Sequence, residues 1–234
     1  MKTLLLVSYI ILAVNAYQFD DAIYNQYLSK DFESLADDEE ITILNHRARR
    51  ETEDPKCHHK HHHHHHLCCG AEDLEALHNE LRDIKKECFK EVTGKETFHG
   101  KPFDPFNCDD IEQRKKEMIC VKQCVGKKKN AVDEEGNLKE DVIKKYVTEH
   151  TSMEWLKPKL DDMLTKCFAE AKEAGEKTDK SDKNACNPAH IKFQHCMFRE
   201  TQLACPEDKI EDPKTCEIVR QFAKHSSFFP HPPH

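Results

Sequence analysis

The chain has 234 residues, with 36 Lys and Arg against 44 Asp and Glu, a formal net charge of −8 and twelve cysteines. Acidic and basic residues are mixed through most of the chain, so it lacks the basic stripe that a nucleic-acid surface requires. The apolar run of residues 4–14 is too short to span a bilayer, and no other segment approaches about eighteen apolar residues, which argues against membrane insertion.

Residues 1–16 have the pattern of a signal peptide. Lys2 precedes the apolar run, and small residues stand at Val14 and Ala16, so we expect cleavage after Ala16. The protein is therefore predicted to be secreted and extracellular. In that oxidising compartment, an even number of cysteines predicts a disulfide framework rather than catalytic thiols.

Residues 17–50 form an acidic leader that contains no cysteine and few residues able to build a core. It ends in Arg47-Ala48-Arg49-Arg50, which resembles the sites cut by furin-like convertases. Two interpretations stay open. The leader is either a propeptide removed after Arg50 or a flexible arm with an uncut basic patch.

Residues 51–67 form a histidine-rich linker. Its imidazoles can bind zinc, copper or nickel without a preformed fold, although a plain low-complexity linker explains the same composition. No other cofactor is required. The candidate metal ligands are His58, His59, His61, His62, His63, His64, His65 and His66.

Residues 68–224 are predicted to form one helical domain. Apolar residues at steps of three and four predict an amphipathic helix over residues 72–92, which Gly94 ends. A loop over residues 98–108 follows. The next helix is predicted over residues 111–125, and Gly126 is expected to end it.

Further helices are predicted after a turn at residues 133–137. The first covers residues 138–147, and Pro158 opens the second, which Gly175 is expected to close. Asn187 and Pro188 are a typical cap and first turn for a helix that runs to about Glu200. A last helix covers residues 213–224, and residues 225–234 form a His, Pro and Phe tail. No strand pattern of useful length occurs, so the domain should be all-α.

The pair Cys120-x3-Cys124 is central to the expected framework. Two residues four apart on a helix lie on the same face, so each sulfur can tie this helix to a different neighbour.

The cysteine spacing resembles that of insect odorant-binding proteins of the Plus-C subclass. The matching features are the intervals between successive cysteines: Cys120-x3-Cys124, Cys124-x42-Cys167, Cys167-x18-Cys186, Cys186-x9-Cys196, Cys196-x8-Cys205 and Cys205-x10-Cys216. Pro206 directly after Cys205 matches as well. The resemblance covers about residues 68–216. The histidine tract and the furin-like leader depart from the family pattern.

The resemblance implies a compact bundle of about six to eight helices around an apolar cavity. It also implies three core bridges, Cys88–Cys124, Cys120–Cys186 and Cys167–Cys196. Cys108 is an alternative first cysteine, but Cys88 is favoured because it lies on a buried stripe. The other six would form three further bridges whose pairing the spacing leaves open: Cys57, Cys68, Cys69, Cys108, Cys205 and Cys216.

By this resemblance the protein is a secreted carrier of small hydrophobic ligands such as odorants or pheromones. It would be a monomer or weak dimer, with a membrane chemoreceptor as a further partner. The inward stripes and loops supply the expected cavity wall: Leu81, Phe103, Phe106, Ile119, Tyr146, Trp155, Met163, Phe168, Met197 and Phe222.

Two other functions compete with this one, an extracellular metal binder that uses the histidine tract and a non-olfactory secreted effector. An enzyme is disfavoured because the chain has no Gly-x-Ser-x-Gly, His-Glu-x-x-His or phosphate-loop motif. The tail residues Phe228 and Phe229 are either a frayed end or a pH-dependent cover of the cavity.

Overall fold

The structure, a computed structural model, describes residues 67–95, 108–178, 182, 185–210 and 212–225. In these residues the secondary structure is helical, and no β-strand occurs beyond one isolated bridge between Val132 and Leu138. The elements are α4 (Ala71–Thr93), α5 (Cys108–Lys128), α6 (Glu140–His150), η2 (Lys157–Lys159), α7 (Leu160–Glu176), α8 (Ala189–Ala204), η3 (Glu207–Lys209) and α9 (Pro213–His225).

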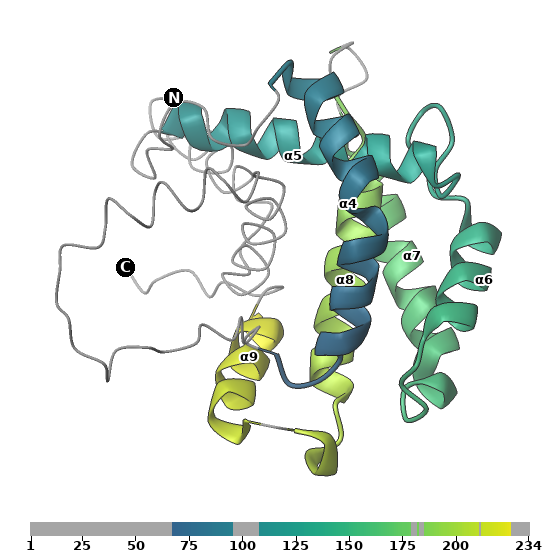
Figure 1. Cartoon of the computed structure of the whole chain (residues 1–234), viewed down its shortest axis with the longest axis vertical. Coiled ribbons are helices and arrows are strands. Elements are labelled where there is room, and N and C mark those ends of the chain that lie inside the picture. The colour runs from purple at the N-terminus through teal and green to yellow at the C-terminus, as the bar shows by residue number, and fades with distance from the viewer. Residues whose placement is uncertain (1–66, 96–107, 179–181, 183–184, 211, 226–234) are drawn as a thin grey trace, which may run out of the picture.

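The helices form a bundle in which α7 packs on α8, α4 on α5, and α9 on α8. Figure 1 shows α4 passing in front of α8, α5 crossing near one end of both, and α6 standing at the outer side beside α7. The largest core cluster joins α6, α7 and α8 around Leu164, Ala171 and Phe193. A second cluster joins α4 and α5 around Leu81, Phe89 and Val125. Each fully buried Leu or Phe of this kind contributes about 1.5–3 kcal/mol to folding.

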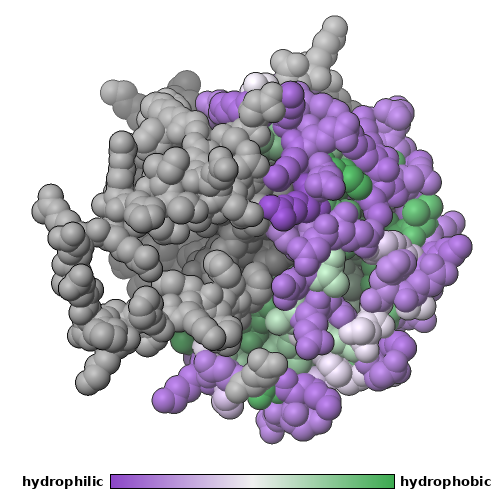
Figure 2. Space-filling model, viewed as in Figure 1, coloured by the Kyte–Doolittle hydropathy of each residue, from purple (hydrophilic) through white to green (hydrophobic). Residues whose placement is uncertain are grey.

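Most of the described surface on the face shown in Figure 2 is hydrophilic, with smaller hydrophobic areas between the charged side chains. Among the described residues, the large apolar side chains that stay exposed are Val142 and Ile218. None of the described helices has both the length and the apolar composition needed to cross a membrane.

The all-α prediction is confirmed, and several predicted boundaries fall within a few residues of the observed ones. Gly94, with a φ of 68°, ends α4, and its backbone amide donates to the Lys90 carbonyl at 2.9 Å. The turn at residues 133–137 is closed by Asp133, whose carboxylate accepts from the Asn137 amide at 2.8 Å. Asn187 accepts from the Ala189 amide at 2.9 Å at the start of α8.

Two glycines that were expected to end helices lie just inside them, and the reason is the same in both. Gly126 lies inside α5, where an added Cβ would stand 2.9 Å from Nδ1 of His190. Gly175 lies inside α7, where it would stand 2.8 Å from Oδ1 of Asn187. These glycines are needed because another side chain touches the helix backbone there, so they do not mark helix ends.

Five disulfides connect the described helices. Cys88–Cys124 joins α4 to α5, Cys120–Cys186 joins α5 to the segment before α8, and Cys167–Cys196 joins α7 to α8. These are the three pairs that the resemblance implies, and Cys120 and Cys124 tie α5 to different neighbours.

The two remaining bridges connect distant parts of the chain. Cys68–Cys216 and Cys69–Cys205 attach the segment before α4 to α9 and to the end of α8, with sequence separations of 148 and 136 residues. In the chain-entropy model, loops of this length give a bridge its largest effect on the unfolded state, more than about 4 kcal/mol each. Cys57 and the side chain of Cys108 lie outside the described residues.

We expect the double variant Cys120→Ala/Cys186→Ala to lose about 2–5 kcal/mol of unfolding free energy, because it removes a bridge without leaving a free thiol. Guanidinium unfolding measures the loss. In the unmodified protein, alkylation under denaturing conditions without reduction should label neither Cys120 nor Cys124, and labelling of either would contradict this framework.

Candidate ligand-binding cavity

A cavity of about 400 Å³ lies between α4, α5, α6 and α8. The segment that follows α6 completes its wall with Thr151, Met153 and Leu156. Its volume is within the range of small-molecule pockets in proteins. The helices therefore surround a space that their side chains do not fill.

Apolar side chains from three helices form most of the wall. Leu74, Leu77 and Leu81 follow one stripe of α4, because residues at steps of three and four share a helix face. From the other helices come Val142, Ile143 and Val147 of α6, and Phe193, Met197 and Phe198 of α8.

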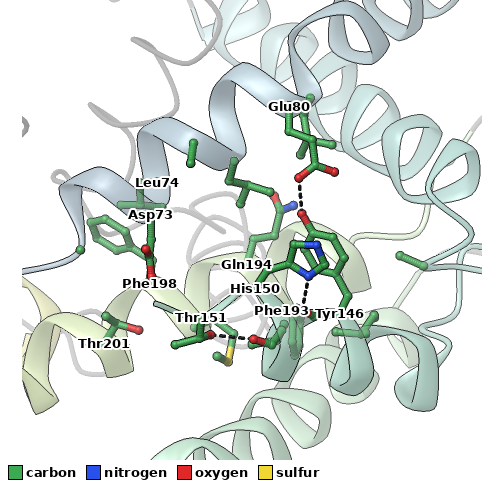
Figure 3. A pocket seen from close by; sticks show the side chains of 18 of the residues that line it. Asp73, Leu74, Glu80, Tyr146, His150, Thr151, Phe193, Gln194, Phe198 and Thr201 are labelled. Atoms are coloured by element: carbon green, nitrogen blue, oxygen red, sulfur yellow. Dashed lines mark hydrogen bonds between the residues drawn. The ribbon is translucent and has the colours of Figure 1, made fainter. Parts of the chain in front are cut away.

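A polar network joins α4 to α6 across the cavity, as Figure 3 shows. The Tyr146 hydroxyl donates to a Glu80 carboxylate oxygen at 2.6 Å, and Nζ of Lys129 donates to the other oxygen at 2.5 Å. The Tyr146 ring stacks on His150 with centroids 4.1 Å apart.

The protonation states in this network follow from its contacts. Hydrogen bonds from Lys129 and then from Tyr146 lower the pKa of Glu80. Burial, and then the hydrogen bond to Glu80, raise the pKa of Tyr146. Near neutral pH the network is thus a carboxylate held by an ammonium and a neutral phenol.

One end of the cavity is formed by the start of α4, where Asp73 and Leu74 lie at the left of Figure 3, and by the segment after α6. Asp73 accepts hydrogen bonds from both the backbone amide and the hydroxyl of Ser152. Gly70, with a φ of 82°, leaves room for Met153, whose Sδ would lie 3.3 Å from a Cβ at that position. Both contacts hold the segment after α6 against α4.

The opposite end, where α5 crosses, contains buried basic groups. Nδ1 of His190 donates to the Lys122 carbonyl at 2.7 Å, and Lys85 and Lys122 also line the cavity. Burial lowers the pKa of His190 to about 4, so its imidazole is neutral at pH 7. The ring therefore acts as a hydrogen-bond donor and not as a cation.

Three of the predicted wall residues line this cavity, namely Leu81, Tyr146 and Met197. They come from three different helices, and the fold brings them together around one space. Their contact with a ligand stays a prediction.

Four other predicted wall residues lie outside the cavity. Met163 and Phe168 are buried in α7, where Phe168 stacks on Phe193 with centroids 4.9 Å apart. Ile119 packs against the cluster of Ile191 and Phe198, and Trp155 packs against the cluster around the two long-range bridges. The inward stripe of α7 therefore packs against other helices and not against the cavity, whereas α5 reaches the cavity through Lys122 and Val125 and not through Ile119.

The remaining candidates cannot be placed in this site. Phe103, Phe106, the histidine tract of residues 58–66 and the tail of residues 226–234 lie outside the described residues, as does the side chain of Phe222. One cluster in the described part, Cys88, Glu91 and Cys124, has the spacing of metal ligands, but its two sulfurs form a disulfide and are not thiolates.

Several lining residues were not predicted. Leu74 and Leu77 share the stripe of Leu81 and were recognisable as its neighbours. Lys85 stands four residues after Leu81 on the same stripe, and a lysine at an apolar position is a signal visible in the sequence. Lys122 and His190 carry no comparable signal, because only the packing of α5 against α8 brings them to the cavity.

Comparison with known proteins gives one family. The model of the PBP/GOBP family matches residues 70–191, which is more than half of the chain and extends from α4 into the beginning of α8. No curated protein and no solved structure matches the chain.

The buried imidazole predicts how stability depends on pH. In the unfolded chain His190 binds a proton near pH 6.5, whereas in the folded protein it does so only near pH 4. Its contribution is therefore intact above pH 6.5 and lost as pH falls from 6.5 toward 4, by up to about 3 kcal/mol.

We expect His190→Asn, whose amide can still donate to the Lys122 carbonyl, to show a flatter decline of unfolding free energy over this window. The control His150→Asn changes an exposed histidine of α6 and should keep the wild-type slope. Urea unfolding at half-unit pH steps measures both, and equal slopes in the wild type and His190→Asn would exclude this origin.

Proposed function

Because the chain belongs to the PBP/GOBP family, the insect odorant-binding proteins, we propose that it is a secreted carrier that encloses a small hydrophobic molecule such as an odorant or pheromone. Its cysteine count and its disulfides fit the Plus-C type of this family. The observation that carries the proposal is the cavity of about 400 Å³ with Leu74, Leu77, Phe193 and Met197 in its wall.

An unfilled core of this size is costly without a ligand. Measured penalties of about 24 cal/mol per Å³ would give about 10 kcal/mol for a closed void of this volume, and the cost here is smaller because exposed residues such as Val142 line part of the space. The disulfides, which typically contribute about 2–4 kcal/mol each and more where they close a long loop, can offset that cost. A framework that maintains an apolar space is what a carrier of hydrophobic molecules requires.

We propose that α6 is the wall that moves when a ligand enters or leaves. The sequence has no cysteine between Cys124 and Cys167, so no disulfide holds α6. The described hydrogen bonds that join α6 and the segment after it to α4 are those of Tyr146 with Glu80 and of Ser152 with Asp73. Opening there breaks hydrogen bonds, whereas moving α4, α5, α7 or α8 strains a covalent bridge.

The first prediction concerns the cavity itself. A fluorescent apolar probe such as N-phenyl-1-naphthylamine should bind the delipidated protein, and Met197→Trp should weaken binding at least about tenfold because the larger side chain fills the space. Ile218→Trp, which adds the same side chain on the exposed face of α9, is the control and should bind as the wild type does. Absence of probe binding, or equal binding by both variants, would refute the proposed function.

The second prediction concerns α6. Tyr146→Phe removes the hydroxyl that reaches Glu80, and we expect ligand dissociation to accelerate about tenfold, since a hydrogen bond to a charged group contributes about 1.5–3 kcal/mol. Lys144→Met removes a polar contact of α6 on its other side, with Asp161 at 2.8 Å, and should leave the rate unchanged. Stopped-flow displacement of the probe distinguishes these outcomes, and an unchanged rate in Tyr146→Phe would show that α6 is not the moving wall.

A further inference from the structure

The two long-range bridges begin at adjacent cysteines, so each cysteine has two candidate partners. In the observed pairs, Cys68 is bonded to Cys216 of α9 and Cys69 to Cys205 at the end of α8. Cys68, Cys205 and Cys216 are buried in one cluster, and Cys69 packs against it. All four side chains thus meet at one place in the fold. Proximity alone does not decide between the observed pairs and the exchanged pairs, Cys68–Cys205 and Cys69–Cys216.

One side chain binds the backbone of both adjacent cysteines. Gln202 of α8 is 1% exposed, and its Oε1 accepts from the Cys68 amide at 2.6 Å and from the Cys69 amide at 3.4 Å. Its Nε2 donates to the Cys69 carbonyl at 3.0 Å. A carboxamide supplies both the acceptor and the donor that this arrangement uses. Gln202 therefore holds the two cysteines in one position relative to α8.

The place of Gln202 in α8 indicates why Cys69 meets Cys205. Gln202 precedes Cys205 by three residues, so the two lie on the same side of the end of this helix. Arg220 of α9 donates from Nη2 to the Cys205 carbonyl at 2.5 Å. It stands four residues after Cys216, on the same face of α9. Polar contacts thus position α8 against both the segment before α4 and the helix that contains Cys216.

The register of the segment before α4 sets the direction of each sulfur. Neighbouring side chains of a non-helical segment point in different directions, so fixing the backbone fixes which cysteine faces which partner. A slip by one residue would bring Gly70 to the place of Cys69. Gly70 is already engaged in the start of α4, where it has a φ of 82° and its carbonyl accepts from the Leu74 amide at 3.1 Å.

We propose that Gln202 selects the disulfide partners of Cys68 and Cys69, as a positioning residue in the maturation of the bridge framework. The proposal concerns how the covalent framework forms, and it does not rest on the carrier function. It also bears on the cavity, because Cys69, Gly70 and Gln202 line one end of it. Exchanged pairs would turn this segment and change that part of the wall.

The test is oxidative refolding of the reduced full-length chain in a glutathione buffer. Oxidised glutathione accepts the two electrons of each cysteine pair and is released as two molecules of reduced glutathione, whose sulfurs take up the two thiol protons. Exchange in this buffer is reversible, so the final ratio of observed to exchanged pairs reports their relative free energies. Alkylation of the remaining thiols then stops the exchange.

Mass spectrometry of a tryptic digest identifies the pairs. Trypsin releases these four cysteines in one disulfide-linked assembly of residues 61–82, 200–209 and 215–220. Backbone fragmentation between Cys68 and Cys69 shows which of the other two peptides each cysteine carries. We expect the observed pairs to exceed the exchanged pairs at least about tenfold in the wild type. The same chain oxidised in guanidinium supplies the ratio without the contacts of Gln202.

The decisive variant is Gln202→Met, which keeps the length of the side chain and removes both polar atoms. It should lower the ratio at least about tenfold, toward the value in guanidinium. Gln202→Glu keeps an acceptor for both amides and should stay closer to the wild type. Gln194→Met is the matched control, because it removes the same group from α8 at a site that contacts His190, and it should pair as the wild type does.

A second control separates pairing from stability. Val219→Ala leaves a void in the same cluster but removes no hydrogen bond, so it should lower the unfolding free energy and keep the wild-type ratio. Wild-type pairing in Gln202→Met would overturn the proposal, as would a ratio in Val219→Ala that falls as far as in Gln202→Met. Should Gln202→Met give no soluble oxidised protein, Gln202→Leu replaces it. Equal ratios for the wild type in buffer and in guanidinium would contradict the proposal without any variant.

Discussion

Disulfide bridges between helices that surround an unfilled space are the constraint on which the rest of this structure depends. In an ordinary small domain, close packing of side chains supplies most of the stability, and each void reduces it. Here the α4 side of the bundle is held to α5 by Cys88–Cys124 and to the α8–α9 end by the bridges of Cys68 and Cys69. Because α4 is fixed at both ends, it can stand away from α8 without collapsing onto it. The cavity is thus a consequence of where the covalent links are.

The distribution of bridges also divides the bundle into a fixed part and a less constrained part. α7 and α8 share a bridge and the largest core cluster, so their relative position is fixed by both covalent and apolar contacts. α6 contributes Ile143 to that cluster but has no bridge, and its described hydrogen bond to α4 is that of Tyr146 with Glu80. Hydrogen bonds exchange with water at a modest net cost, whereas a disulfide does not open in an oxidising environment. The same cavity is therefore bounded by helices that disulfides hold and by α6, which apolar contacts with α7 and α8 and a hydrogen bond to α4 hold in place.

Local patterns in the sequence were enough to predict the helices and the all-α fold, and the family resemblance implied an apolar cavity, but neither identified all of its wall. The spacing of apolar residues and the capping residues identify the buried face of a helix. They do not show whether that face packs against another helix or borders a cavity. Met163 and Phe168 are as apolar and as inward as Met197, but only Met197 borders the cavity, since α7 packs directly on α8. The same limit explains Gly126 and Gly175. In sequence they are typical helix stops, whereas in the structure they accommodate His190 and Asn187 from distant segments.

The polar groups that line the cavity differ in what they contribute to the stability of the ligand-free protein. Glu80, Lys129 and Tyr146 satisfy one another, and the contact between α4 and α6 that they form accounts for their presence. Lys85 and Lys122 are buried in the same wall, and Nζ of Lys85 lies 3.4 Å from Nδ1 of His78. Even a paired buried charge is often no more stabilising than an apolar replacement. Buried lysines in a largely apolar wall are therefore weak contributors to the stability of the fold.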